Sequence, residues 1–190
     1  MALGDDGRAT LAVVDLIAGR TRLRPVAPGD VDVLATILAT PDVARWWPNY
    51  DRARVEEEML HPDTDETKWV IDLDGRVVGM IQAAEETEAE FRHASIDLFL
   101  DPSVRGRGIG PDGIRAVAAW LIDHRGHHRL TIDPAADNAA AIAAYRKVGF
   151  RDVGRLRRYQ LMGDGTWADG LLMEMLADEL IRTTGSDTPA

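Results

Sequence analysis

The arrangement of residues best suited to chemistry is an Arg-x-x-Gly-x-Gly pattern in the middle of the chain. It begins at Arg105 in the segment VRGRGIGP, after an apolar run at residues 95–100 and before a helix-like run at residues 113–124. Glycines let a backbone approach a ligand without Cβ clashes, and free N–H groups at a helix N-terminus attract anions. The order strand, glycine loop, helix therefore predicts a phosphate-binding loop. It is not a Walker loop, because no Gly-Lys-Ser/Thr follows, and taken alone it could be a tight turn.

Asp97 is the second unusual residue, because aspartate is depleted in strands and this one lies inside an apolar strand-like run. Strand alternation places it with Ser95 and Phe99 on one face and Leu98 on the other. The carboxylate could have a functional role on this face, or the face could simply be wet. The residues alone leave both interpretations open.

Tyr145 lies in a further distinctive stretch, TIDPAADNAAAIAAYRKVGF, at residues 131–150. On an Ala-rich helix face a tyrosine is ordinarily a packing residue, and Asn138 is a common helix cap. Asp133 precedes a proline and is typical of a turn, while Asp169 reads as a loop aspartate. Taken singly, each of these residues has a structural interpretation.

Three other clusters are ambiguous by composition. The acidic stretch at residues 85–90 is typical of a solvated hairpin tip, although it could also steer a polycation. The three histidines between residues 124 and 128 fall at a helix end without an adjacent carboxylate pair, which favours a solvated turn over a metal site. A Trp pair at residues 46–47 is more often core, although Trp47 could lie on a loop over a substrate.

The composition limits the partners and the location of the protein. The 190 residues fit one domain, which we expect at residues 11–182 between flexible tails at 1–10 and 183–190. The net charge of −10 argues against nucleic acid and anionic membranes and favours a cationic small substrate. There is no cysteine, which excludes disulfides and thiolate metal sites. Without a signal-peptide core or a run long enough to span a bilayer, we expect a cytoplasmic protein, either monomer or homodimer.

Hydrophobic periodicity predicts the elements that must position these residues. Helical patterns cover residues 28–39, 51–60, 110–123 and 138–148, and strand patterns cover 11–17, 21–26, 68–73, 77–83, 91–100, 129–132, 153–161 and 167–176. Between two of the strands, Asp74-Gly75 is a strong hairpin signal. This order predicts an α+β fold, in which one mixed, mostly antiparallel central sheet has helices on both faces.

Together, the segments SIDLFLDPSVRGRGIG and TIDPAADNAAAIAAYRKVGF resemble the two signatures of the GNAT superfamily of N-acetyltransferases. The resemblance covers about residues 20–177 and implies a GNAT-type fold whose central sheet is splayed. Within the superfamily, the sequence is most similar to the aminoglycoside 6'-N-acetyltransferases. That likeness is carried by Asp97 in IDLFL, by Asp133 ahead of Asn138, by Asp169 and by the Trp pair.

The resemblance implies acetyl-CoA as co-substrate, no metal, and direct transfer of the acetyl group in a ternary complex to an amine of an aminoglycoside antibiotic. The expected acceptor is the 6'-amine, and the outcome is resistance. Asp97 would take the ammonium proton and Tyr145 would protonate the leaving thiolate. The expected coenzyme-binding residues are Leu98, Phe99, Leu100, Arg105, Gly106, Arg107, Gly108, Ile109, Gly110, Asn138 and Tyr145. The expected acceptor-binding residues are Trp47, Glu85, Asp97, Asp133 and Asp169.

The loop departs from the family pattern at Pro111, which has no N–H to offer a phosphate but is tolerated in a first helical turn. The charges of Arg105 and Arg107 would compensate. Three alternatives stay open: a siderophore-type lysine acyltransferase, a protein N-terminal acetylase, and a non-catalytic coenzyme A-binding protein in which Asp97 and Tyr145 are structural.

Overall fold

The computed structural model describes residues 14–182, so the expected tails at 1–10 and 183–190 lie outside the described residues. Eight strands within this range form one sheet: β1 Leu16–Ala18, β2 Thr21–Pro25, β3 Glu66–Leu73, β4 Arg76–Glu86, β5 His93–Leu100, β6 Arg129–Ile132, β7 Arg151–Leu161 and β8 Trp167–Leu176. The α-helices are α1 Val31–Leu38, α2 Pro41–Ala44, α3 Arg52–Leu60, α4 Ile109–Asp123 and α5 Ala139–Arg146. Among the described residues, no helix is long and apolar enough to cross a membrane.

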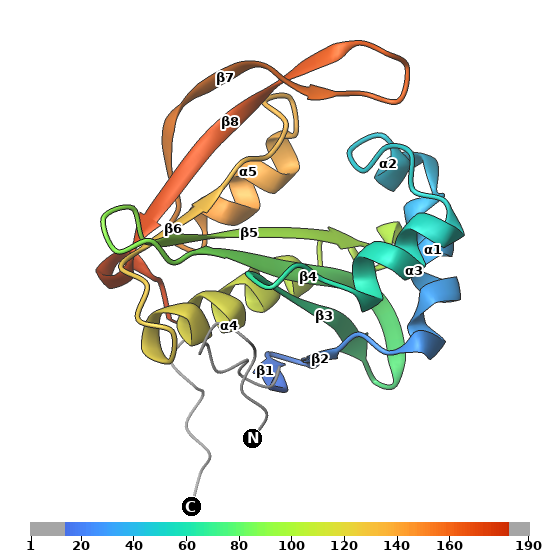
Figure 1. Cartoon of the computed structure of the whole chain (residues 1–190), viewed down its shortest axis with the longest axis horizontal. Coiled ribbons are helices and arrows are strands. Elements are labelled where there is room, and N and C mark those ends of the chain that lie inside the picture. Colours follow the sequence, from blue (N-terminus) through green and yellow to red (C-terminus); the bar gives the residue numbers. More distant parts are fainter. Residues whose placement is uncertain (1–13, 183–190) are drawn as a thin grey trace, which may run out of the picture.

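The strand order is β1-β2-β3-β4-β5-β6-β8-β7, and the pairing is antiparallel except between β5 and β6 (Figure 1). This confirms the mixed, mostly antiparallel sheet expected from the sequence. The hairpin between β3 and β4 turns at Asp74 and Gly75, with φ of 53° and 83°. Both values lie in the left-handed region, which Asp and Gly tolerate better than most residues, so the Asp-Gly signal is confirmed.

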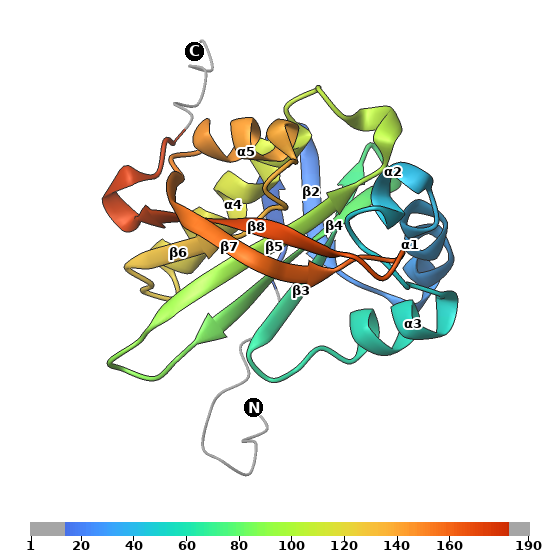
Figure 2. The same cartoon turned by 90° about the horizontal axis from the view of Figure 1, so that it is seen from above.

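Helices cover both faces of the sheet (Figure 2). Ile81 and Ile96 belong to the core that packs under α4 and α5, whereas Met80 and Phe99 belong to the core under α1 and α3. The neighbouring residues Met80 and Ile81 enter different cores because successive side chains on a strand point to opposite faces. The hydrophobic side chains of β4 and β5 therefore pack into the cores on both faces of the sheet.

The sheet splays between β5 and β6. These strands pair only at Ala94 and Ser95, opposite Leu130 and Thr131, and the rest of β5 runs on without a partner from β6. Strands β7 and β8 lift away from β5 on the far side of the gap (Figure 1). The splay leaves an open strand edge in the middle of the domain, and the first turn of α4 and the whole of α5 lie beside it.

Some local expectations were wrong. Pro41 does not merely end a helix, because it opens the short helix α2. Glu85 lies in β4 rather than in a solvated hairpin tip, and Asp169 lies in β8 rather than in a loop. His127 is buried instead of lying in a solvated turn, because its ring packs against the end of β4.

Candidate active site

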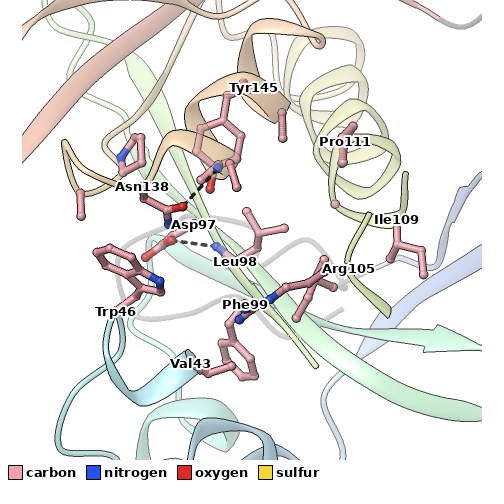
Figure 3. A pocket seen from close by; sticks show the side chains of 18 of the residues that line it. Val43, Trp46, Asp97, Leu98, Phe99, Arg105, Ile109, Pro111, Asn138 and Tyr145 are labelled. Carbon is pink, nitrogen blue, oxygen red and sulfur yellow. Dashed lines mark hydrogen bonds between the residues drawn. The ribbon is translucent and has the colours of Figure 1, made fainter. Parts of the chain in front are cut away.

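A cavity of about 740 Å³ lies where β5 leaves β6 (Figure 3). Its walls come from the second half of β5, the loop before α4, the helix α5 and the loop after α2. Most of the residues expected from the sequence line it, namely Trp47, Asp97, Leu98, Phe99, Leu100, Arg105, Gly106, Gly108, Ile109, Gly110, Asp133, Asn138 and Tyr145. Segments that are distant in the sequence therefore converge on one site.

Asp97 projects from β5 into this cavity, and one of its oxygens accepts a hydrogen bond of 2.8 Å from the N–H of Leu98 (Figure 3). The side chain is exposed to the cavity, but the cavity lies deep enough that protein surrounds the carboxylate. Desolvation raises the pKa of Asp97 to about 7, and the negative charge of Asp133 adds to the effect. Asp97 can therefore bind and release a proton near neutral pH.

Tyr145 points from α5 toward Asp97 (Figure 3) and is only 8% exposed. Burial raises the pKa of its hydroxyl, and the charges of Asp97 and Asp133 raise it further. The hydroxyl thus stays protonated at neutral pH and is a proton donor beside a potential proton acceptor.

The glycine loop forms the opposite end of the cavity. Gly106 and Gly108 have φ of 74° and 84°, a region that other residues rarely adopt, and Gly108 is the N-cap of α4. The first-turn N–H groups of Ile109 and Gly110 have no preceding helical carbonyl to bind, so they are free to meet an anion. Pro111 occupies the third position of α4 and leaves the helix intact.

Basic side chains supplement this loop. Arg105 lines the cavity as expected, and so do Arg115 and Lys147, which the sequence analysis did not select. The guanidinium of Arg115 donates to the backbone oxygen of Lys147 at 3.0 Å, which ties α4 to the end of α5. Asp112 also lines this end and accepts a hydrogen bond of 2.8 Å from Arg115, so three cations face one anion there. A loop with free N–H groups and this excess of positive charge is suited to the phosphates of a coenzyme. Arg107 does not line the cavity.

Asn138 and Asp133 lie in the loop that connects β6 to α5. The side-chain oxygen of Asn138 accepts a hydrogen bond of 3.2 Å from the N–H of Ala141 and caps the helix that carries Tyr145. Asp133 faces the cavity, and burial raises its pKa. One end of the cavity is therefore acidic and the other is basic.

Two residues expected to bind the acceptor lie outside the cavity. Glu85 forms a buried cluster with His127, at 2.7 Å, and with Arg125, at 2.9 Å. Its burial opposes ionisation, but these hydrogen bonds outweigh the burial and hold the pKa of the carboxyl below its usual range. Asp169 accepts hydrogen bonds from the N–H of Arg158 and the guanidinium of Arg155, at 2.7 and 2.6 Å. Both carboxylates are thus engaged in structural contacts. Among residues 14–182, no group of three or more His, Asp or Glu side chains could hold a metal ion.

The sequence from residue 20 to residue 151 matches the family model of the acetyltransferase (GNAT) domain. This chain belongs to the GNAT acetyltransferase family. Members of the family take their acetyl group from acetyl-CoA, and the glycine loop and cations at one end of the cavity suit the phosphates of such a donor.

Individual relatives extend the comparison. An uncharacterized protein of Mycobacterium leprae is 35% identical over 83 residues, which are 44% of this GNAT chain but only 21% of the relative. The spermidine N(1)-acetyltransferase of Escherichia coli K12 is 22% identical over 145 residues, 73% of this chain and 77% of the relative. Mycobacterium smegmatis RimJ, in complex with CoA-disulfide, is 26% identical with a TM-score of 0.74, covering 89% of this chain and 88% of its own.

Tyr159 and Gln160 of β7 also line the cavity of this GNAT domain, and the sequence analysis missed both. The side chain of Gln160 donates to the backbone oxygen of Trp46 at 2.8 Å and so joins β7 to the loop after α2. One signal was present in the sequence. The run RLRRYQ at residues 155–160 breaks the alternation of polar and apolar residues, as bulged strands do.

Proposed function

We propose that this GNAT protein transfers an acetyl group from acetyl-CoA to an aminoglycoside antibiotic, at the 6'-amine, by direct attack in a ternary complex. One observation carries the proposal: Asp97, Asp133 and Tyr145 meet in a cavity whose other end is a phosphate-type glycine loop. The sequence resemblance to aminoglycoside 6'-N-acetyltransferases supports the choice of acceptor.

The basic end of the cavity binds the donor. N–H groups at the start of α4 and the charge of Arg105 hold the pyrophosphate, while Arg115 and Lys147 add positive charge at the same end. When bound, acetyl-CoA supplies an activated acyl group. The backbone of Leu98, Phe99 and Leu100 on the open edge of β5 binds the donor's pantetheine arm and thioester oxygen.

At the acidic end, the acceptor is oriented and its proton is moved. Its amines are largely protonated at neutral pH and are attracted to Asp97 and Asp133. With its pKa near 7, Asp97 accepts the proton from the reacting ammonium, directly or through a water, and frees a nucleophilic amine. Tyr145 stays protonated and gives its proton to the sulfur that leaves.

A linear polyamine is the second candidate acceptor, because the relative from Escherichia coli is a spermidine N(1)-acetyltransferase. The same two carboxylates would bind the separated ammonium groups of a polyamine. A polyamine lacks the rings and hydroxyl groups of an aminoglycoside, so an activity assay with both compounds distinguishes the two candidate acceptors.

The experiment is a thiol-release assay with purified protein, acetyl-CoA and a panel of amines. Kanamycin and tobramycin should release coenzyme A, whereas an analogue with a 6'-hydroxyl in place of the amine should not. If spermidine were the only good acceptor, the substrate would be a polyamine and not an aminoglycoside. Turnover of lysine derivatives or free peptide N-termini alone would point to the siderophore or protein class. A protein that binds acetyl-CoA but turns over no amine would be a non-catalytic binder.

A further inference from the structure

Strand β7 carries a bulge at the cavity. Leu156 pairs with Gly170 and Gln160 pairs with Ala168, so four steps along β7 oppose two steps along β8. Within the bulge Arg158 has a φ of 51°, which is rare for a non-glycine residue. Such conformations persist only where contacts from the surrounding structure hold them.

The bulge presents Tyr159 to the cavity. The aromatic ring lies against Gly170 of β8, and a Cβ added at Gly170 would lie 2.8 Å from Cδ1 of the tyrosine. That distance is shorter than any normal carbon contact, so a side chain at Gly170 would push the ring away. Tyr159 and Asp133 line the same cavity, where the Tyr159 hydroxyl interacts with the Asp133 carboxylate. This pairing raises the pKa of Tyr159 to about 12.

Asp169 braces both partners of this pair. Its carboxylate accepts hydrogen bonds from the backbone of Arg158 and the guanidinium of Arg155, which holds the bulge. Its backbone oxygen accepts a hydrogen bond of 2.8 Å from the N–H of Ala136, three residues after Asp133. Leu171 likewise donates to the backbone oxygen of Pro134 at 2.8 Å. Strand β8 therefore fixes Tyr159 from one side and the Asp133 loop from the other.

We propose that Tyr159 is an acceptor-positioning residue: it orients the Asp133 carboxylate toward an ammonium group of the bound polycation, and Asp169 and Gly170 act through it. The inference rests on the proposed function, since it assigns a role at the acceptor end of the same site. It predicts a loss of acceptor affinity without a loss of donor binding, because Tyr159 belongs to β7 and interacts with Asp133 rather than with the glycine loop.

The test compares two glycine-to-alanine variants of the same hairpin. Gly170→Ala adds a methyl group against the Tyr159 ring, whereas Gly154→Ala adds one where nothing lies within 4 Å. For Gly170→Ala we expect the KM for the amine to rise roughly tenfold, the scale of one lost hydrogen bond to a charged group. The kcat should change less, and the Kd for acetyl-CoA should stay unchanged. Gly154→Ala should behave as the wild type.

Tyr159→Phe supplies the second arm, because it keeps the ring and loses the hydroxyl. It should also raise the KM for the amine, and adding Gly170→Ala to it should cause little further change, since both act on one contact. Equal KM values in the two glycine variants, a parallel loss of acetyl-CoA affinity, or additive effects in the double variant would overturn the inference while leaving the proposed function intact. A wild-type protein that turns over no amine would overturn both.

Discussion

The carboxylate of Asp97 accepts a hydrogen bond of 2.8 Å from the N–H of the next residue, Leu98. This N–H is thus donated to a side chain, at the point where β5 has lost its neighbour β6. Protonation of Asp97 weakens the carboxylate as an acceptor and releases the N–H. In the proposed reaction, transfer of the amine's proton to Asp97 would therefore free a backbone donor for the thioester oxygen.

The activity should follow the ionisation of Asp97. With a pKa of about 7, the carboxylate is charged only above that pH, so kcat/KM should rise with pH through about 7 and then level. Asp97→Asn keeps the size of the side chain and removes the base. It should lower kcat/KM by roughly two to four orders of magnitude and abolish the rise near pH 7. Steady-state rates between pH 5.5 and about 9 measure both effects. A variant with wild-type turnover would remove Asp97 from the mechanism.

The stability of the protein should report the same group without any substrate. Burial raises the pKa of Asp97 from 3.8 to about 7, so the folded state holds this proton more tightly than the unfolded chain. Ionising the group in the folded protein therefore costs stability, and the cost accumulates as the pH rises from about 4 to 7. Asp97→Asn removes that cost, so its gain in Tm should be larger at pH 8 than at pH 5. Equal gains at both pH values would contradict the raised pKa.

Tyr145→Phe separates proton donation from packing. The ring of Tyr145 lies 6.5 Å from that of Phe150, and the phenylalanine variant keeps this contact. We expect kcat to fall while the Kd for acetyl-CoA, measured by calorimetry, stays near the wild-type value. A weaker Kd with an unchanged kcat would instead make Tyr145 a binding residue.

Donor binding should depend on the glycine loop. Acetyl-CoA binds the folded state and should raise the Tm. Gly108→Asp places a negative charge at the N-cap of α4 and should abolish this shift. The matched control is Gly165→Asp. Gly165 has a nearly identical φ of 82°, but it lies in the turn between β7 and β8, where a Cβ added to it would have no other atom within 4 Å. The control should keep the shift, and loss of the shift in both variants would show only a general loss of folding.

Glu85 should matter for stability and not for the acceptor. Glu85→Ala leaves Arg125 and His127 without their buried partner, which should cost roughly 3 kcal/mol of the free energy of unfolding. The neighbouring Glu86 is exposed, so Glu86→Ala should change stability by less than about 0.5 kcal/mol. Urea denaturation measures both variants. A higher KM for the amine in Glu85→Ala, with stability unchanged, would return Glu85 to the acceptor site.

The sequence by itself determined most of the elements and the position of the glycine loop. The glycine loop, the Asp-Gly hairpin and the periodic runs that became α4 and α5 are local signals, because φ preferences and helix termini are decided within a few residues. Asp97 and Tyr145 were assigned through the family resemblance, since each lies in a contiguous segment that resembles one of the family signatures, while the residues alone left a structural interpretation open. Their meeting in one cavity follows from the order of those elements.

Only the tertiary structure decided which carboxylates face the cavity. Glu85, Asp133 and Asp169 are similar in sequence, as acidic residues near turns, yet only Asp133 lines the cavity. Glu85 is hydrogen-bonded to Arg125 and His127, which are distant in the sequence. Asp169 is hydrogen-bonded to Arg155 and to the backbone of Arg158, which the bulge of β7 brings near. For Tyr159 the sequence offered only the broken alternation of residues 155–160, which does not say where the side chain points. The direction of a side chain on β7 depends on its register against β8, and a register shift is decided by the partner strand and not by the run itself.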